Sequence, residues 1–287
     1  MSIPLKGLQR ETTDKFYTKE KVVNQCLQQV RKKICIDYNK DLIIEPSAGS
    51  GAFMKGITSL CKNFKFYDLL PDHESIEKLD YLTLTQEIYN NWKQDFSQIH
   101  VIGNPPFGRQ SSLALKFIRL SCLFCDTLSF ILPKSFKKDS MKQKIPQYFH
   151  LVYEFELSQN SFEVDGEEHD VPCIFQIWEK RQEKREINDR VIPNLFNFVK
   201  KNEQPHISFR RVGVYAGRID IVTDEEILEQ KSAESHYFIR FTNDETIENN
   251  VEKLKDLHFN NKNDTVGPKS ISKQELIKIF NLKLNCD

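Results

Sequence analysis

Short apolar runs alternate with helix-like patterns through the first 180 residues, and this alternation restricts the possible folds more than any other feature. Around the runs, apolar residues recur with helical spacing, and Thr18 is expected to cap the first of these helices. Such alternation predicts an α/β fold, in which a mostly parallel sheet carries helices on both faces. The expected strands are 41–46, 64–70, 74–82, 99–104, 127–133, 150–157 and 171–180.

The last two of these seven strands have no helical pattern between them, so they should pair antiparallel. Charged residues then dominate over 179–190, which predicts a boundary between a domain 1–182 and a region 183–287. The second region has strand-like segments at 206–222 and 235–241 and two helical segments, the last opened by a capping box at Ser272 and Glu275. It is therefore expected to be a small α+β region.

The composition is that of a globular protein, with 39% hydrophobic and 29% charged residues and 41 basic against 41 acidic side chains. Zero net charge argues against a chain held on nucleic acid by bulk electrostatics, but it permits a local basic face. No apolar run is long enough for a membrane span, and the N-terminus lacks the apolar core of a secretory signal, so an intracellular protein, cytoplasmic or nuclear, is expected. Cys122 and Cys125 are read as core residues near a helix end, ahead of half a zinc site or a redox pair.

The segment "IIEPSAGSGAF" runs from a strand through a glycine-rich turn into a helix, an arrangement that sets backbone N–H groups beside a ligand. It has neither the Gly-Lys-Ser/Thr of a Walker A loop nor the G-x-G-x-x-G spacing of the dinucleotide fingerprint. Alone it is weak evidence for a site.

Two later strands are expected to end in acidic residues. Asp68, at the end of the second strand, is well placed to accept both hydroxyls of a ribose, although a turn cap is the simpler reading. "DYL" ends the third strand, where Asp80 can meet an adenine edge while Tyr81 covers the ring. "QDF", with Asp95, offers a similar pair, and Asp80 is preferred because its strand follows the second at a short spacing.

The segment "NPPF" follows the strand 99–104, whose carboxyl end should lie beside the glycine turn. The side-chain carbonyl of Asn104 and the main-chain carbonyl of Pro105 are acceptors, Pro106 stiffens the backbone, and Phe107 offers a flat face. Two acceptors and a ring suit an exocyclic amine on a planar base. The alternative is a turn stiffened by proline for its own sake.

In this order, "EPSAGSGAF", Asp68, "DYL" and "NPPF" resemble the S-adenosylmethionine-dependent adenine-N6 methyltransferases. "DKFYT" (14–18) is similar to the cofactor motif that precedes the glycine turn in members with the γ-type order, and "LSFILPKSF" and "VPCIFQIWEK" match later strands. The resemblance covers about residues 14–180. It implies a Rossmann-like class I methyltransferase fold and S-adenosylmethionine as cofactor.

The resemblance also implies residue roles. Asn104, Pro105, Pro106 and Phe107 would form the catalytic segment, and a second aromatic, Phe162, would sandwich the target base. Lys134 is a candidate substrate contact or an ordinary solvated lysine. The implied cofactor residues are Tyr17, Thr18, Glu45, Pro46, Ala48, Gly49, Gly51, Asp68, Asp80 and Tyr81.

The expected partner is DNA, with RNA as an alternative because the site meets only the amine and its base. A protein glutamine methyltransferase is disfavoured by Phe107, since tyrosine is usual there, and a non-catalytic binding subunit is disfavoured by the intact motifs. Arg210, Arg211, Arg218 and Arg240 lie among aromatic residues in the C-terminal region, which suits target recognition or an accessory role. A homodimer or a partner subunit stays open. A target adenine in duplex DNA would have to flip out of the stack.

Overall fold

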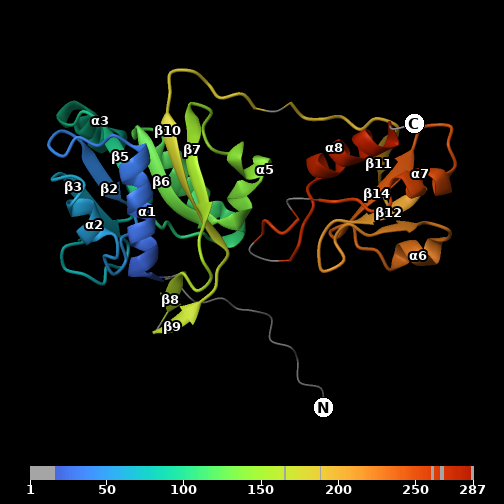
Figure 1. Ribbon diagram of the computed structural model, residues 1–287, viewed down its shortest axis with the longest axis horizontal. Coiled ribbons are helices and arrows are strands. Elements are labelled where there is room, and N and C mark those ends of the chain that lie inside the picture. Colours follow the sequence, from blue (N-terminus) through green and yellow to red (C-terminus); the bar gives the residue numbers. More distant parts are fainter. Residues whose placement is uncertain (1–16, 165, 188, 260–261, 266–267, 286–287) are drawn as a thin grey trace, which may run out of the picture. The chain divides into compact units, whose positions relative to one another are not determined.

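The computed structural model describes residues 17–164, 166–187, 189–259, 262–265 and 268–285, so most of "DKFYT" lies outside the described residues. The chain separates into two compact units, Met1–Glu186 and Ile187–Asp287 (Figure 1). The sequence had suggested a change of organisation between residues 182 and 183.

Unit 1 is built on a seven-stranded sheet with the order β4-β3-β2-β5-β6-β10-β7. The pairs β4–β3, β3–β2, β2–β5 and β5–β6 are parallel, whereas β10 pairs antiparallel with both β6 and β7. The prediction of a mostly parallel sheet whose last strand is antiparallel is confirmed. The strands are β2 (Leu42–Glu45), β3 (Phe64–Asp68), β4 (Glu77–Lys78), β5 (Ile99–Gly103), β6 (Thr127–Pro133), β7 (Phe149–Glu156) and β10 (Cys173–Lys180).

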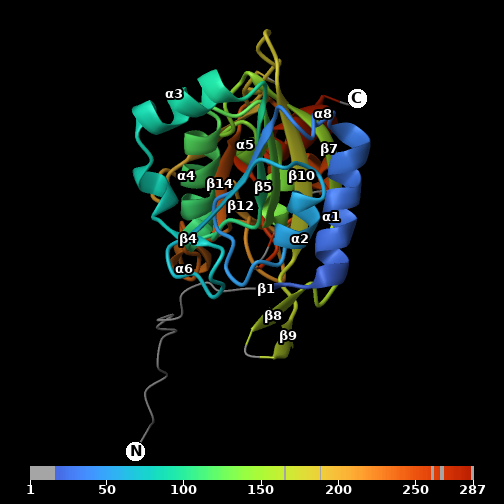
Figure 2. The same cartoon turned by 90° about the vertical axis from the view of Figure 1, so that its left-hand side faces the viewer.

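Helices cover both faces of this sheet, and each face has its own apolar core. Figure 2 shows α1 and α2 on one side of β5, with α3 and α4 on the other. Alternation along β2 divides its side chains, because Ile43 packs into the α1–α2 core whereas Leu42 and Ile44 pack into the α3–α4 core. The helices are α1 (Glu20–Lys33), α2 (Met54–Thr58), α3 (Gln86–Asp95), α4 (Ser112–Ser121) and α5 (Asp139–Lys142).

The expected strand over 74–82 is mostly wrong. Only β4 pairs with β3, and the chain then forms the short 3₁₀ helix η1 (Tyr81–Thr83). Asp80 explains the change, since its Oδ1 accepts from the backbone N–H of Leu82 at 3.0 Å and so caps η1.

A small three-stranded sheet joins distant parts of unit 1. It consists of β1 (Tyr17–Thr18), β8 (Phe162–Val164) and β9 (Glu167–His169), with Thr18 opposite Phe162. Thr18 is therefore a strand residue, and the expected helix cap is wrong: Lys19 occupies the N-cap of α1 and makes no side-chain capping bond.

Unit 2 is an α+β unit, as predicted. Its antiparallel sheet has the order β11-β14-β12-β13, and the ring of Phe280 on α8 packs edge-on against Phe196 and Phe209, with centroids 5.4 and 5.8 Å apart. Sequence patterns had not indicated β11 or α6. The elements are β11 (Phe196–Val199), β12 (Ile207–Arg210), β13 (Ile219–Ile221), α6 (Glu225–Glu229), β14 (His236–Phe241), α7 (Ile247–Lys253) and α8 (Lys273–Leu284).

Within the described part of the chain, none of the helices combines the length and the apolarity that crossing a lipid bilayer requires. The cysteines described are free thiols, and Cys122 and Cys125 are buried directly after α4, as expected of core residues at a helix end.

Candidate active site

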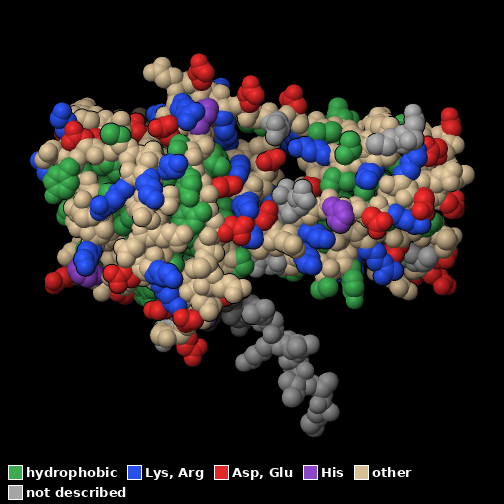
Figure 3. Space-filling model, in the orientation of Figure 1, with side chains coloured by type: hydrophobic (Ala, Val, Ile, Leu, Met, Phe, Trp, Pro, Cys, Tyr) green, Lys and Arg blue, Asp and Glu red, His purple; other side chains and the backbone are tan. Residues whose placement is uncertain are grey.

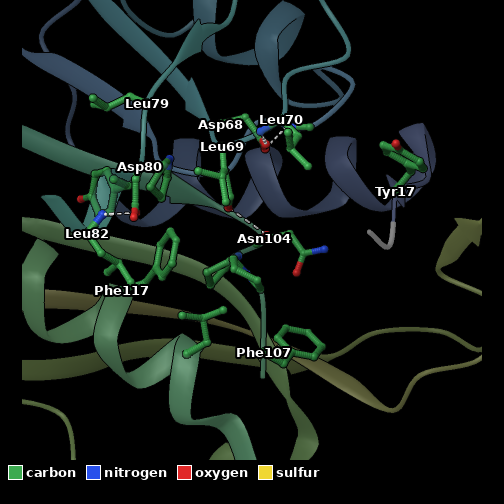
Figure 4. Close-up of a pocket in the computed structure, with 17 residues that line it drawn as sticks. Tyr17, Asp68, Leu69, Leu70, Leu79, Asp80, Leu82, Asn104, Phe107 and Phe117 are labelled. Atoms are coloured by element: carbon green, nitrogen blue, oxygen red, sulfur yellow. Dashed lines mark hydrogen bonds between the residues drawn. The ribbon is translucent and has the colours of Figure 1, made fainter. Parts of the chain in front are cut away.

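A cavity of about 410 Å³ lies at the carboxyl ends of β2, β3 and β5 (Figure 4). The order of strands reverses there, because β3 and β5 lie on opposite sides of β2, and ligands of open α/β sheets collect at such points. A smaller hollow of about 40 Å³ shares part of the lining and adds Thr18, Glu45 and Ala48. The predicted site residues that line the larger cavity are Tyr17, Pro46, Gly49, Asp68, Asp80, Tyr81, Asn104, Pro105, Pro106 and Phe107.

The glycine turn after β2 needs its glycines. Gly49 and Gly51 adopt φ values of +55° and +85°, and a Cβ on Gly51 would lie 2.5 Å from Met54 Sδ. Gly51 does not line either hollow among the described residues, so its contribution is to the shape of the turn.

Asp68 is held by this turn. Its Oδ2 accepts from the backbone N–H of Gly49 and its Oδ1 from that of Leu70, each at 2.8 Å (Figure 4). A carboxylate has about four acceptor positions, so these two bonds fix the group and leave capacity for a ligand.

Glu45, the last residue of β2, is buried with its Oε2 lacking a hydrogen-bond partner among the described residues. Burial, to which the negative charge of Asp68 adds, raises the pKa of Glu45 well above its usual range. Its side chain therefore offers an oxygen without a partner at the smaller hollow, and a positive charge placed beside it would favour the ionised form.

The "NPPF" segment leaves β5 along the cavity wall. Asn104 is fixed from two sides: its Nδ2 donates to Thr18 Oγ1 at 3.2 Å, and its main-chain oxygen accepts from Ser47 Oγ at 3.1 Å. The carbonyl of Phe107 accepts from the backbone N–H groups of Leu113 and Ala114, which ties the segment to the start of α4. The Phe107 ring is half-buried at the cavity.

Tyr81 lines the cavity from within the core. Its side chain is 1% exposed, its ring stacks on Phe117 with centroids 5.4 Å apart, and its hydroxyl shares a 2.8 Å hydrogen bond with Ser121. The tyrosine is thus a buried residue that also lines the edge of the cavity, and its contact with an adenine ring stays a prediction. Apolar walls that sequence reasoning missed come from Leu69, Leu70, Leu79, Leu82, Leu113 and Phe117.

Phe162 also departs from expectation. Its side chain is 1% exposed and belongs to the core on the α1–α2 face of the sheet, so it presents no face to the cavity. The expectation that it stacks on a target base is corrected, because pairing of β8 with β1 carries this residue inward.

Lys134 begins the 3₁₀ helix η3 (Lys134–Lys137) after β6 and pairs with Glu156 at 2.7 Å. Hydrogen bonds from Lys134 and Lys137 hold the pKa of Glu156 below its usual range. Lys134 does not line the cavity among the described residues, and Asp95, the alternative to Asp80, is exposed at the end of α3.

No family model and no curated protein matches the chain. Among solved structures, it is similar to the 23S rRNA methyltransferase ErmE, at 12% identity over 59% of this chain and 71% of that chain, with a TM-score of 0.41. It is also similar to the N-methyltransferase NodS from Bradyrhizobium japonicum (11% identity, 56% and 96% of the two chains, TM-score 0.37). An rRNA methylase from Streptococcus thermophilus gives 13% identity, 56% and 95% of the chains and a TM-score of 0.31.

These likenesses are distant, and the strand order of unit 1 identifies the fold independently. Five strands in the order β4-β3-β2-β5-β6, followed by the antiparallel β10 inserted before β7, form the sheet of a Rossmann-like class I methyltransferase. Unit 1 has that fold.

Proposed function

We propose that this chain transfers a methyl group from S-adenosylmethionine to the N6 amine of adenine in DNA. The observation that carries the proposal is that Asn104 and the Pro105–Phe107 segment line the same cavity as Asp68 and the glycine turn. A cofactor and a flat amine-bearing base can therefore meet in one space at the carboxyl edge of the sheet.

The residues fit the cofactor. A buried carboxylate with an unused oxygen, Glu45, suits the ammonium of the methionine part, and Asp68 suits the ribose hydroxyls. Leu79, Leu82 and Phe117 supply apolar surface for an adenine ring, with Asp80 beside them. When bound, S-adenosylmethionine supplies an electrophilic methyl group on a sulfonium.

The protein's own contribution to the reaction is positioning and electrostatics. The side-chain carbonyl of Asn104 and the main-chain carbonyl of Pro105 accept the two N–H bonds of the target amine, which aims its lone pair and stabilises the positive charge that develops on nitrogen. Phe107 stacks on the base. The proline pair keeps this presentation rigid, since both φ angles are fixed.

DNA is favoured over RNA by the unit that follows the catalytic one. Unit 2 carries arginines on and beside its strands, including Arg210, Arg211 and Arg218, in a chain whose net charge is zero. This group of arginines suits contacts with the phosphates around a flipped-out adenine.

The test is incubation of the protein with labelled S-adenosylmethionine and matched DNA and RNA, followed by digestion to nucleosides. Label in N6-methyldeoxyadenosine is expected. Label confined to N6-methyladenosine would replace DNA by RNA as the substrate, and label in neither would reject adenine methylation.

An Asn104→Ala variant serves as the matched control. We expect it to bind the cofactor product S-adenosylhomocysteine like the wild type and to lose transfer by about a hundredfold or more, as for other preorganised polar groups. Full transfer by this variant would refute the role of Asn104.

A further inference from the structure

The connection between β12 and β13 in unit 2 exposes two adjacent apolar side chains. Val214 is 79% and Tyr215 is 65% exposed, in a unit whose other aromatic rings mostly pack inward. Neither residue belongs to the cavity of unit 1 or to the core of unit 2. These two side chains, with the loop 211–218 that carries them, are called the apolar tip.

The apolar tip is held out by backbone bonds. The Gly213 N–H donates to the Lys269 carbonyl and the Ile271 N–H to the Arg211 carbonyl, each at 2.9 Å, while Val212 and Ser270 form an antiparallel bridge. At the far side of the loop, the Gly217 N–H donates to the Arg210 carbonyl at 2.8 Å. The loop is therefore braced on both sides, and its apolar side chains point into water because the fold holds them there.

Basic residues flank the apolar tip in the sequence and in the segment that braces it, and Asp220 follows directly. The segment 206–219 contains three arginines and no acidic residue, and 268–273, which braces it, contains two lysines and no acidic residue. The whole chain is neutral, and basic and acidic side chains are interspersed over the face shown in Figure 3. The excess of positive charge around the tip is thus a local feature.

Individual contacts limit which cations are available. The Arg218 side chain is 64% exposed and pairs with Asp220 at 2.7 Å, so part of its charge is balanced. Arg211 lies over the ring of Tyr237, 5.3 Å from its centroid, and donates to the Glu234 carbonyl. Lys269 is exposed.

We infer that the apolar tip enters a groove of duplex DNA, where Val214 and Tyr215 contact bases while Arg218 and Lys269 approach the phosphates. The inference rests on the proposed function and names the part of unit 2 that meets its substrate. Small apolar wedges flanked by cations are how many proteins enter the minor groove and open a base step. Two side chains are too few for a protein partner, since a stable interface takes about 20–30 residues a side.

The test measures binding of the full chain to a fluorescein-labelled DNA duplex at several salt concentrations. A Val214→Ser/Tyr215→Ser variant should bind about tenfold more weakly at every salt concentration, because it loses base contacts and no charge. An Arg218→Gln variant should instead lower the slope of log affinity against log salt by about one.

The matched control replaces two apolar residues of unit 2 that are equally exposed, Ile192 and Leu282. Ile192→Ser/Leu282→Ser should bind the duplex like the wild type, and all variants should keep wild-type affinity for S-adenosylhomocysteine. Wild-type duplex binding by Val214→Ser/Tyr215→Ser would overturn the inference and leave the proposed function standing.

Two other outcomes would overturn the inference in different ways. A wild-type chain that binds S-adenosylhomocysteine but no duplex would overturn the proposed DNA substrate and the inference with it. If the Val214→Ser/Tyr215→Ser change abolished binding to phosphatidylglycerol vesicles, or self-association in sedimentation, while duplex binding stayed intact, the tip would be a lipid or self-contact and the inference would be wrong.

Discussion

Asn104 Nδ2 donates to Thr18 Oγ1 over 3.2 Å, joining two residues that are 86 positions apart in the sequence. Thr18 is itself held in β1 by pairing with β8, and the next residue, Lys19, donates its N–H to the Ser161 carbonyl at 3.1 Å. Because the amide nitrogen is directed at the hydroxyl, the amide carbonyl is turned to the opposite side. The small sheet thereby orients the group that we propose holds the target amine.

Thr18→Val keeps the shape of the side chain and removes its oxygen. In a single turnover at saturating cofactor, we expect methyl transfer to slow about ten- to hundredfold, since an unsatisfied buried amide costs about 1–3 kcal/mol. Affinity for S-adenosylhomocysteine, measured by calorimetry, should change by less than about threefold.

Thr18→Ser is the matched control and should restore the rate, because it returns the acceptor. If Thr18 only contacts the methionine part of the cofactor, as the family resemblance implies, the opposite pattern will appear. Affinity would then fall and the rate at saturation would not, which contradicts the orienting role.

Much of unit 1 is predictable because its signals are local. Strands such as β2 and β5 are short apolar runs, and polar residues directly after them reach the carboxyl edge of the sheet in any parallel arrangement. Asp68 and Asn104 were found at the cavity by this rule alone.

The errors have a common physical cause, which is that local patterns do not fix where a side chain points. Thr18 and Phe162 are partners across more than a hundred residues, and only that pairing turns the hydroxyl toward Asn104 and the ring into the core. Asp80 likewise caps η1 instead of ending a strand, and Tyr81 then stacks on Phe117. Long-range strand pairing and helix capping, rather than the alternating pattern of a strand, determine where these side chains point.

Glu45 makes stability depend on pH. Burial and the charge of Asp68 raise its pKa above the ordinary value of 4.5, so the folded state binds the proton more tightly than the unfolded state does. This contribution is complete below pH 4.5 and is lost as pH rises through the folded-state value. Within that window the loss is at most about 1.4 kcal/mol per pH unit.

Glu45→Gln cannot ionise and should escape this loss. Without cofactor, the free energy of unfolding of this variant, measured in urea, should rise relative to that of the wild type as pH increases from about 5 to about 8. Glu156→Gln is the control: lysines lower the pKa of Glu156 below 4.5, so its contribution is lost only at lower pH, and this variant should run parallel to the wild type between about pH 5 and about pH 8. An advantage of Glu45→Gln that is equal at both pH values would contradict a raised pKa of Glu45.

Comparing Gly51 with Gly166 separates the role of the glycine turn in cofactor binding from the strain that a side chain causes at positive φ. Both have similar φ values, +85° and +83°, but a Cβ on Gly166 would meet nothing within 4 Å, whereas one on Gly51 would press on Met54. Gly51→Ala and Gly166→Ala should each lose about 1–2 kcal/mol of stability. Only Gly51→Ala should also weaken S-adenosylhomocysteine binding, by about tenfold; equal affinities in the two variants would show that the turn is not part of a cofactor bed.

Phe107 and Phe162 should respond to the same substitution in opposite ways. Leucine keeps apolar volume and loses the flat face, so Phe107→Leu, at the half-buried cavity position, should unfold like the wild type within about 1 kcal/mol. Its methyl transfer should fall about tenfold because stacking of a base on an aromatic ring contributes about 1–3 kcal/mol.

Phe162→Leu, in the core, should lose about 1–3 kcal/mol of stability while its folded molecules transfer at the wild-type rate. Urea unfolding and single-turnover methylation, measured on both variants, test whether Phe107 rather than Phe162 stacks on the target base. A Phe162→Leu variant that is as stable as the wild type but transfers slowly would show that Phe162 contacts the base.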